Sequence, residues 1–409
     1  MHDSLYKSEK NNSFNLFLTL ISIILIITPY FNRNFPVSIW SGIIALWYIN
    51  VFFRKGGKYT FEINSFILVL WFLWCFTLRI VGLSSAAWGN YFLLFCSIDV
   101  IIKALYIKNN YNDREKKILL RCLIICLLTT LLMNLLIWIK DSSEFENFNF
   151  FVDKYQKTNK IQSAQFYNMY SFLIGDSLYL YLTEHKKKYR ILDLTIIIVT
   201  GIFLLLVNPR MNSIIITLIL CLSTIFFIKP GAERKIGLLI LLLAISVALL
   251  LLFKEQILNT VSPRLKPRIE SLYYMLSGKD YDVEGSSMSR RIELQLISLR
   301  TFVSSPKNFI LGAGLHLGSE NYRIIGQHGF ITDYLAAYGL IGLSFLLFLF
   351  KRLFNDYKCM YHNKETRTFM NCILTTFFLA SLICNSFCKE VCVSAFLIPV
   401  LFIEKNQND

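Results

Sequence analysis

The sequence predicts an all-α polytopic membrane protein with about 12 transmembrane helices and one large outward-facing loop. Three observations lead to this prediction. The chain has 409 residues, of which 55% are hydrophobic and 15% aromatic. Continuous apolar runs recur at lengths close to the roughly 20 residues that cross a bilayer. Because these runs do not alternate with polar residues, they favour helices over a closed barrel. One long polar segment, residues 254–327, interrupts them.

The apolar runs divide the chain into three parts. Residues 1–253 contain nine predicted spans, residues 254–327 form the large loop, and residues 328–409 contain three more spans. No small-residue cleavage site follows the first run, so we expect it to remain as a span. The predicted spans lie near residues 14–30, 37–53, 63–83, 90–107, 118–139, 164–183, 191–207, 211–228, 236–253, 328–350, 367–384 and 388–403.

The formal net charge of +15 is concentrated in short loops between the spans. Basic residues occupy every second short loop, as in Lys186–Lys188 and Lys351–Arg352. Since basic loops stay on the cytoplasmic side, both termini are predicted to be cytoplasmic and the 254–327 loop to face outward. A smaller loop near 140–163 faces the same way. No aromatic-interleaved basic surface lies outside the predicted membrane, so we expect no nucleic-acid partner.

The large loop is not one continuous helix, because it contains Pro263, Pro267, Pro306 and the pair Gly312-x-Gly314. Within it, the stretch Ser289–Val303 has an amphipathic helical pattern. Its apolar positions follow one another at i, i+4, i+7 and i+11, which predicts a helix lying on the membrane surface. These positions are Ile292, Leu296, Leu299 and Val303.

Ten cysteines lie mostly inside apolar runs. Cys384, Cys388 and Cys392 are spaced at i, i+4 and i+8, which places them on one face of a helix. Cysteines on one face of one helix do not reach each other, so a disulfide is not expected. No histidine lies nearby to complete a metal site.

Three arginine sites on the predicted outer side are candidates for binding an anion. Arg210 follows Asn208-Pro209, a good helix start, and a cation in a first turn opposes the helix dipole unless an anion is present. Arg290 can pair with Glu293, which leaves Arg291 for a ligand whose oxygens suit a guanidinium. Arg264 and Arg268 flank Pro267 just outside the ninth span. Contact with lipid headgroups is the alternative for Arg210, and a solvated loop face or a headgroup contact is the alternative for Arg264 and Arg268.

His328 lies where the tenth predicted span begins, near the outer N-terminus of that helix. The helix dipole disfavours its protonation, which suits a neutral imidazole acting as a base. On a regular helix Thr332 shares its face, whereas Asp333 lies about 140° away. A histidine at a membrane interface is most often structural, so its role depends on the motif around it.

Charged residues inside the predicted spans are further candidates, since such residues often serve ion or proton relays. Asp99 and Lys103 are four residues apart in the fourth span, and Asp176 lies in the sixth. The pair Asp280 and Asp282 is similar to the metal-binding pair of nucleotide-sugar transferases, but nucleotide sugars are absent outside the membrane. No phosphate-binding glycine-rich loop is present, so nothing indicates ATP.

Taken together, the motifs between residues 200 and 350 resemble the O-antigen ligase and polymerase superfamily. The resemblance rests on Ser289-x-Arg291, Gly312-x-Gly314, Gly326-x-His328-Gly329 and the run from Asp333 to Gly342, with Arg210 opening a span. The form around His328 is more similar to repeat-unit polymerases of the Wzy type than to ligases, which tend to have His-Asn. Gly329 departs from the Asn or Ser that is more usual after the histidine.

The resemblance implies a GT-C-like glycosyltransferase of the bacterial inner membrane, with its active site facing the periplasm. Its substrate would be an undecaprenyl-diphosphate-linked oligosaccharide, whose lipid diphosphate is the leaving group. No cofactor and no metal are expected, and a chain-length regulator protein is a further expected partner beside membrane lipid. By the resemblance, His328 would be the general base, Arg210 and Arg291 would stabilise the diphosphate, and Arg290, Arg264 and Arg268 would assist in binding.

Three functions are weighed on this basis. The first is polymerisation of lipid-linked repeat units. The second is transfer of the glycan to lipid A-core by an O-antigen ligase. The third is a flippase or transporter of lipid-linked sugars, which should show inverted repeats and polar sites at the membrane midplane. The concentration of polar sequence in one outward loop favours an enzyme.

Overall fold

In a computed structural model, every regular secondary-structure element in the described part of the chain is a helix. This part comprises residues 2–28, 36–55, 88–140, 164–183, 187–204, 211–228, 289–314, 329–359, 364–384 and 387–402, with single positions or short pieces at 31, 70–81, 256, 259 and 325. These residues form thirteen α-helices and one π-helical turn. The helices are α1 (His2–Ile27), α3 (Val37–Lys55), α5 (Trp88–Asn110), α6 (Asp113–Lys140), α9 (Ala164–Thr183), α10 (Lys187–Ile202), α11 (Met211–Ile228), α15 (Ser289–Val303), α16 (Pro306–Leu311), α17 (Phe330–Cys359), α18 (Lys364–Ile383), α19 (Lys389–Cys392) and α20 (Ile398–Phe402), with the π-turn η4 (Val393–Leu397).

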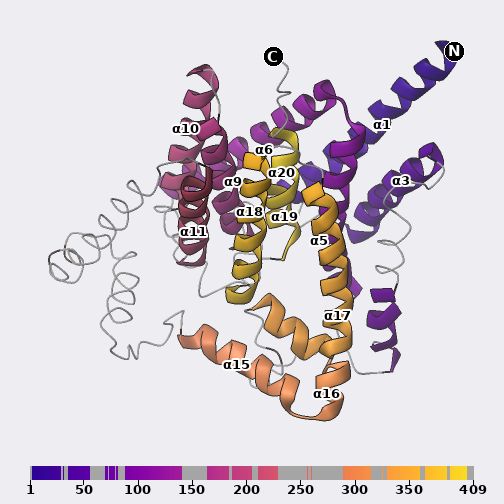
Figure 1. The fold of residues 1–409 in the computed structure, drawn as a ribbon, viewed down its shortest axis with the longest axis vertical. Coiled ribbons are helices and arrows are strands. Elements are labelled where there is room, and N and C mark those ends of the chain that lie inside the picture. Colours follow the sequence, from indigo (N-terminus) through magenta and orange to yellow (C-terminus); the bar gives the residue numbers. More distant parts are fainter. Residues whose placement is uncertain are drawn as a thin grey trace.

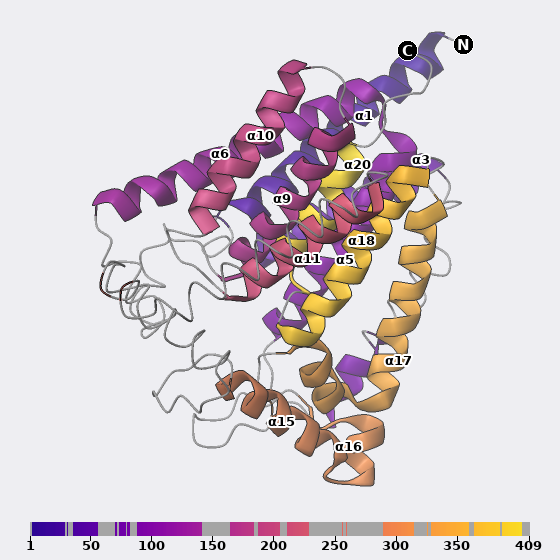
Figure 2. The same cartoon turned by 60° about the vertical axis from the view of Figure 1, so that its left-hand side comes forward.

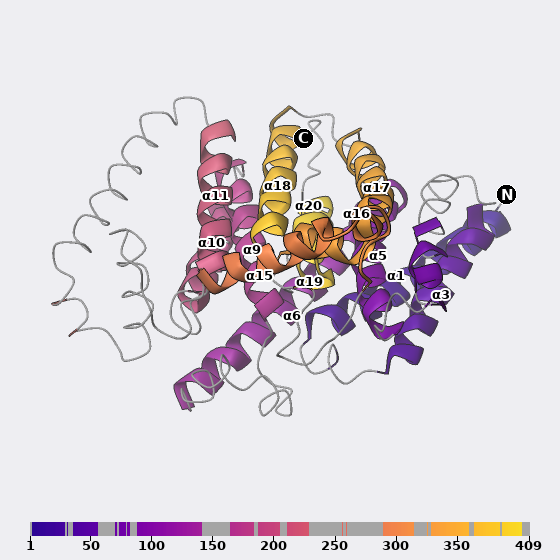
Figure 3. The same cartoon turned by 90° about the horizontal axis from the view of Figure 1, so that it is seen from below.

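The helices form a bundle whose two ends differ. Figure 1 shows the start of α1 and the helix α20 toward one end, and α15 with α16 at the opposite end. α17 and α18 run side by side along the bundle (Figure 2). Seen from below, α15 crosses the end of the bundle toward α16 and α17 (Figure 3). The sequence segment 289–314 therefore lies across one end of the other helices rather than among them.

Two helices in the described part are long and apolar enough to cross a membrane. They are the stretch Asp113–Leu136 of α6 and the whole of α17. Ser13–Ile27, Val37–Val51 and Ser213–Ile228 are shorter apolar helices. Every predicted span except 236–253, which lies outside the described residues, contains helical residues. The all-α class is thus confirmed for the described residues, whereas the number of spans and their orientation stay predictions.

The last predicted span, 388–403, is not one regular helix. α19, η4 and α20 follow one another over 14 residues, which corresponds to about 21 Å of helix. Tyr357 of α17 donates a hydrogen bond to the carbonyl of Phe396 within the π-turn, where the regular helical hydrogen bonding is altered. The Phe396 ring packs edge-on against Phe377 of α18 at 5.1 Å between ring centroids. This short final helix is therefore fixed by α17 and α18.

The placement of three cysteines on one helical face is wrong. α18 ends at Ile383 and α19 begins at Lys389. Cys388 is extended, with φ −133° and ψ 156°, so it does not share a helical face with Cys392. Cys384, Cys388 and Cys392 form no disulfide, and neither do the other seven cysteines.

Candidate functional site

The residues expected to form the site are only partly described by the structure. Arg210, Arg264, Arg268 and His328 lie outside the described residues. Arg290 and Arg291 lie in the first turn of α15, with their side chains outside the description. The described helices that flank these positions nevertheless show how the segments meet. We refer to the contact between α15 and the start of α17 as the junction.

One face of α15 forms its side of the junction. Ser298 Oγ donates a hydrogen bond of 2.5 Å to Asp333 Oδ1 on α17, and Gln295 Nε2 donates one of 3.1 Å to the carbonyl of Leu382 on α18. Phe302, one turn after Ser298, is buried. At 100° per residue, position 291 lies on this same face, within about 40° of Gln295 and Ser298. Position 290 lies about 100° away from it.

The remaining faces of α15 agree with the predicted amphipathic helix. The predicted range Ser289–Val303 is confirmed at both ends. Leu296, Leu299 and Val303 are exposed, with 65% of Val303 accessible. They form an apolar stripe that is separate from the face at the junction. Such a stripe suits contact with a membrane surface.

The start of α17 forms the other side of the junction. Asp333 Oδ2 accepts a hydrogen bond of 3.1 Å from the backbone N–H of Gly329, so its carboxylate closes the first turn of the helix. Thr332 Oγ1 donates to the carbonyl of Gly329 at 3.1 Å. Both carboxylate oxygens of Asp333 are thus engaged, one on α15 and one on the backbone next to position 328. Asp333 orients this turn.

Gly329 permits the close approach of the two helices. A Cβ atom at this position would lie 2.6 Å from Thr332 Oγ1 and 3.0 Å from Gln295 Nε2. Both distances are shorter than ordinary van der Waals contact. A larger residue at position 329 would require the Thr332 hydroxyl and the end of the Gln295 side chain to shift, and it would also lie 3.2 Å from the carbonyl oxygen of Leu382. This gives a physical reason for a glycine at this position.

A second contact ties α16 and the chain after it to α17. α17 is broken at Gly339, which has φ 63° and ψ −167°. The break exposes two carbonyls, so that Ala336 accepts from the N–H of Ala313 at 2.8 Å and Ala337 accepts from the N–H of Gly314 at 2.9 Å. The expected single helix over 328–350 is therefore interrupted, and it extends to Cys359.

Glycines make this second contact possible. A Cβ atom on Gly312 would lie 2.3 Å from the carbonyl oxygen of Ala337, and one on Gly339 would lie 2.4 Å from the carbonyl oxygen of Ile310. Both glycines also have positive φ values, of 86° and 63°, which are unfavourable for other residues. The Gly312-x-Gly314 and Tyr338-Gly339 motifs therefore meet in space and serve the same backbone contact.

The aromatic residues of the motif pack into the bundle. Trp71 Nε1 donates a hydrogen bond to the hydroxyl of Tyr334. The rings of Tyr334 and Tyr338 lie 4.5 Å apart between centroids, and Phe330 lies 4.8 Å from Phe387. These contacts anchor the first part of α17 to the bundle next to the junction.

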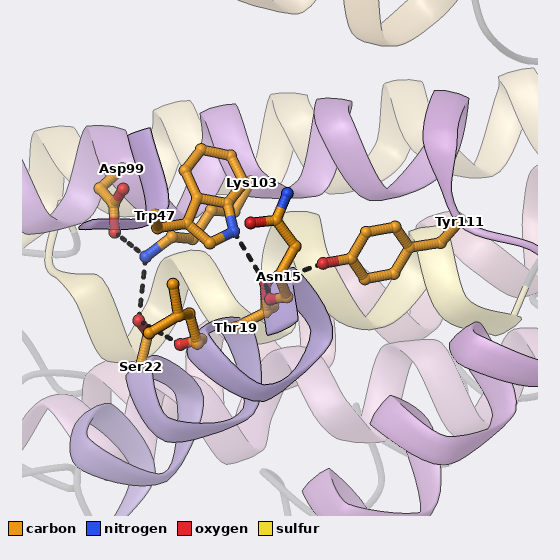
Figure 4. Close-up of polar contacts among 8 residues, drawn as sticks. Asn15, Thr19, Ser22, Trp47, Asp99, Lys103 and Tyr111 are labelled. Atoms are coloured by element: carbon orange, nitrogen blue, oxygen red, sulfur yellow. Dashed lines mark hydrogen bonds and ion pairs between the residues drawn. The ribbon is translucent and has the colours of Figure 1, made fainter. Parts of the chain in front are cut away.

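A second polar region lies inside the bundle, between α1, α3 and α5 (Figure 4). Lys103 Nζ on α5 forms an ion pair of 2.7 Å with Asp99 Oδ2 and donates to Ser22 Oγ of α1 at 3.1 Å. The ammonium also lies 5.3 Å from the ring centroid of Trp47 on α3. Asp99 and Lys103 are only 1% and 3% exposed. The pairing expected from their spacing is confirmed, and we refer to this region as the buried network.

The buried network continues along α1 toward the connection between α5 and α6. Trp47 Nε1 donates to Thr19 Oγ1 at 2.9 Å, and the hydroxyls of Thr19 and Tyr111 lie 3.1 Å apart. Asn50 Nδ2 donates to Asn15 Oδ1. Burial raises the pKa of the Tyr111 hydroxyl, so it stays protonated and available for hydrogen bonding. These side chains fasten three helices together.

Sequence reasoning did not identify a second buried ion pair beside α5. Lys389 Nζ lies 3.6 Å from Glu390 Oε1, both residues are 5% exposed, and α19 packs against α5. The Lys389 ammonium is 4.8 Å from the ring centroid of Trp40 on α3. The sequence did contain an indication of this ion pair, because Lys389 and Glu390 stand at the start of an otherwise apolar run. Buried charges of this kind survive only when they are paired.

Within the described ranges, no group of three or more His, Cys, Asp or Glu side chains is arranged to hold a metal ion. What the junction offers instead is the carboxylate of Asp333, fixed by donors from Ser298 and Gly329. No protein-family model matches this chain, and a search of curated proteins finds no similar sequence.

Proposed function

We propose that the protein is a polysaccharide polymerase of the bacterial inner membrane. It would transfer a growing glycan from undecaprenyl diphosphate onto the next lipid-linked repeat unit. The observation that supports this proposal most is the junction, where the face of α15 that includes position 291 meets the turn that follows position 328. Two motif elements separated by more than 30 residues are thereby brought to one end of the bundle.

The chemistry of the proposed reaction matches the residue types at these positions. A neutral His328 would take the proton from the attacking sugar hydroxyl. Arg291, with Arg210 from the start of α11, would stabilise the negative charge on the departing diphosphate. Arg290, Arg264 and Arg268 would contribute to binding. Because the leaving group is a lipid diphosphate, the reaction needs neither a nucleotide sugar nor ATP.

The register of α15 supports the different roles that the sequence predicts for Arg290 and Arg291. Position 291 lies on the face that contacts α17 and α18, whereas position 290 lies about 100° away. We therefore assign the larger role to Arg291. The apolar stripe of Leu296, Leu299 and Val303 would keep this helix at the membrane surface, where lipid-linked substrates are found.

A transporter of lipid-linked sugars is the second candidate, and the buried ion pairs favour it. Asp99, Lys103, Lys389 and Glu390 place four charges inside the bundle, two of them at the start of a short final helix. Interrupted helices and buried charges are common in transporters. In both cases, however, each charge has an opposite charge beside it within the protein, which favours a structural role.

Polymer formation in a deletion strain tests the proposal. We expect His328→Ala and Arg291→Ala to abolish polymer while the protein remains in the membrane, and Arg290→Ala to reduce it only partly. Arg290→Ala is the matched control, since it removes the same side chain one residue away. Normal polymer length in both His328→Ala and Arg291→Ala would exclude chemistry at the junction.

The glycolipid pattern of the deletion strain separates the alternatives. Single repeat units attached to lipid A-core indicate a polymerase. Accumulation of lipid-linked polymer indicates an O-antigen ligase. Accumulation of single lipid-linked units on the cytoplasmic side indicates a flippase, and it would contradict the proposal.

A further inference from the structure

Asp176 is the only charged residue of α9 (Ala164–Thr183), and it is 2% exposed. Its neighbours one turn away on the same face show what it faces. Phe172 lies 6.3 Å from Phe377 and Tyr179 lies 4.2 Å from Phe369, measured between ring centroids. Both partners belong to α18. Asp176 is therefore directed at the stretch of α18 between Phe369 and Phe377, which contains no charged residue.

Neither carboxyl oxygen of Asp176 has a hydrogen-bond partner in the described part of the chain. The hydroxyls of Ser177, of Thr200 on α10 and of Thr224 on α11 are likewise buried without a partner there. Asp99 differs, because one of its oxygens lies 2.7 Å from the ammonium of Lys103. Of the two aspartates Asp99 and Asp176, only Asp99 has a counter-ion in the described part of the chain.

Among the side chains that the structure describes on the elements packed against α9, none brings a cation to Asp176. On α19, Lys389 pairs with Glu390, and on α10, Arg190 lies over the ring of Tyr181 at 4.8 Å. η4 and α20 contain no titratable residue. The other titratable groups on these elements and on α18 are Lys187, Lys188, Tyr189 and Asp193 of α10, Cys221 of α11, Lys364, Glu365, Arg367, Cys372 of α18, and Cys392 of α19.

An ionised carboxylate buried without a partner costs several kcal/mol, and a buried acid avoids this by keeping its proton. A metal cation would need several oxygen ligands converging on one point, and one carboxylate does not provide them. We propose that Asp176 is a proton-binding site inside the bundle and remains protonated at neutral pH. This inference is independent of the proposed function.

Protonation of Asp176 would couple proton binding to the packing of α9 against α18. The neutral acid is compatible with the closed packing of α9 against α18, whereas the ionised acid is not. Any rearrangement that opens this interface to water therefore releases a proton. Conversely, a proton must be taken up before the interface closes.

The pH dependence of stability tests the proposal on the full-length protein in detergent. An aspartate in an unfolded chain is ionised above about pH 4, so folding would take up one proton at Asp176. The wild type should then lose stability relative to Asp176→Asn as pH rises from 5 to 8. The expected change is about tenfold in the unfolding equilibrium constant per pH unit. The readout is the difference between the two apparent melting temperatures.

The matched control is Asp99→Asn, which removes the partner of Lys103 and should be less stable than wild type at every pH. A difference between wild type and Asp176→Asn that does not change with pH would overturn the proposal. A difference that changes in the opposite direction would show an ionised Asp176 with a bound cation, and would overturn it as well.

A second measurement needs no variant to fold. Dicyclohexylcarbodiimide adds to protonated carboxyl groups in apolar surroundings, where the acid oxygen bonds to the central carbon and the proton moves to a nitrogen. We expect an adduct on the peptide containing Asp176 and none on the peptide containing Asp99, as measured by mass spectrometry. Modification of Asp99 but not of Asp176 would overturn the assignment.

Discussion

The buried network and the junction each contain an aspartate with a defined partner, but they place it in different surroundings. Asp99 is 1% exposed and forms an ion pair with Lys103, which is itself 3% exposed. Asp333 is half-buried and accepts from a serine and a backbone N–H at one end of the bundle. An aspartate carboxylate therefore stabilises the folded state in the buried network, whereas at the junction it positions a helical turn.

This difference in surroundings predicts whether a substitution in each region changes mainly stability or mainly activity. Removing one partner of a buried ion pair leaves an uncompensated charge, which costs far more than the pair contributed. Removing the Ser298 hydroxyl should cost less, because Asp333 is half-buried and its other carboxylate oxygen keeps the N–H of Gly329 as a donor. We therefore expect variants of the buried network to affect folding, and variants of the junction to affect activity.

The largest effect is expected for Asp99→Asn, which leaves the Lys103 ammonium buried without a counter-ion. The free energy of unfolding should fall by about 3–5 kcal/mol. Lys103→Met should be similarly unstable, because it leaves the carboxylate unpaired. The double variant should recover part of the loss, since no charge remains. Apparent melting temperatures of the four proteins in detergent provide the measurement, and additive losses would contradict the pairing.

An intermediate effect is expected for Gly339→Ala. Gly339 lies at the break in α17, where α17 contacts α16 and the chain after it. A residue with a side chain is strained at φ 63° and ψ −167°, and its Cβ would approach the carbonyl oxygen of Ile310 at 2.4 Å. The expected loss is at least about 1–3 kcal/mol. Gly42→Ala is the control, because nothing lies within 4 Å of its Cβ position. That substitution should be neutral or should stabilise α3 by about 0.5–1 kcal/mol.

The smallest effect on stability is expected for Ser298→Ala, which removes one of the two partners of Asp333 at the junction. The free energy of unfolding should fall by about 1.5 kcal/mol, the lower end for a hydrogen bond to a charged group. Under the proposed function, polymer formation should fall much further, because α15 loses its hydrogen bond to the start of α17. Ser344→Ala is a control on the exposed side of α17, where the hydroxyl only bonds its own helix. Equal activity of the two variants would show that the junction does not position the site.

The helices of this protein were predictable because each apolar run is long and continuous. The amphipathic pattern gave both ends of α15, and the spacing of Asp99 and Lys103 gave their ion pair. Both signals are local and depend only on the helical period. The partners Ser22 and Trp47 were not predictable, since they come from other helices and hydroxyl or indole groups in apolar runs are common.

The break in α17 shows what sequence reasoning missed. Tyr338-Gly339-Leu340 reads as the middle of an apolar helix, and a glycine there is tolerated without a break. The interruption depends on the N–H groups of Ala313 and Gly314, which arrive from another part of the chain. The ion pair of Lys389 and Glu390 was missed for a related reason, because charges at the edge of a span are usually solvated.

The predicted site is only partly accounted for by the described residues. The sequence placed Arg290 and Arg291 at the start of one helix, and the register of α15 distinguishes them. Asp333 was expected to lie away from the face of His328, and its carboxylate instead bridges α15 and the N-terminus of α17. That role needed the position of Ser298, which no local pattern provides.

The backbone contact at Gly339 also indicates how relatives of this chain could be recognised. The hydrogen bonds from residues 313 and 314 to residues 336 and 337 involve no side chain, so this contact places no requirement on the side chains at those four positions. What has to be kept is the absence of a Cβ atom at positions 312 and 339. A search for paired glycines at this separation, placed before and within an apolar helix, would find homologues whose overall sequence identity is too low to reveal them.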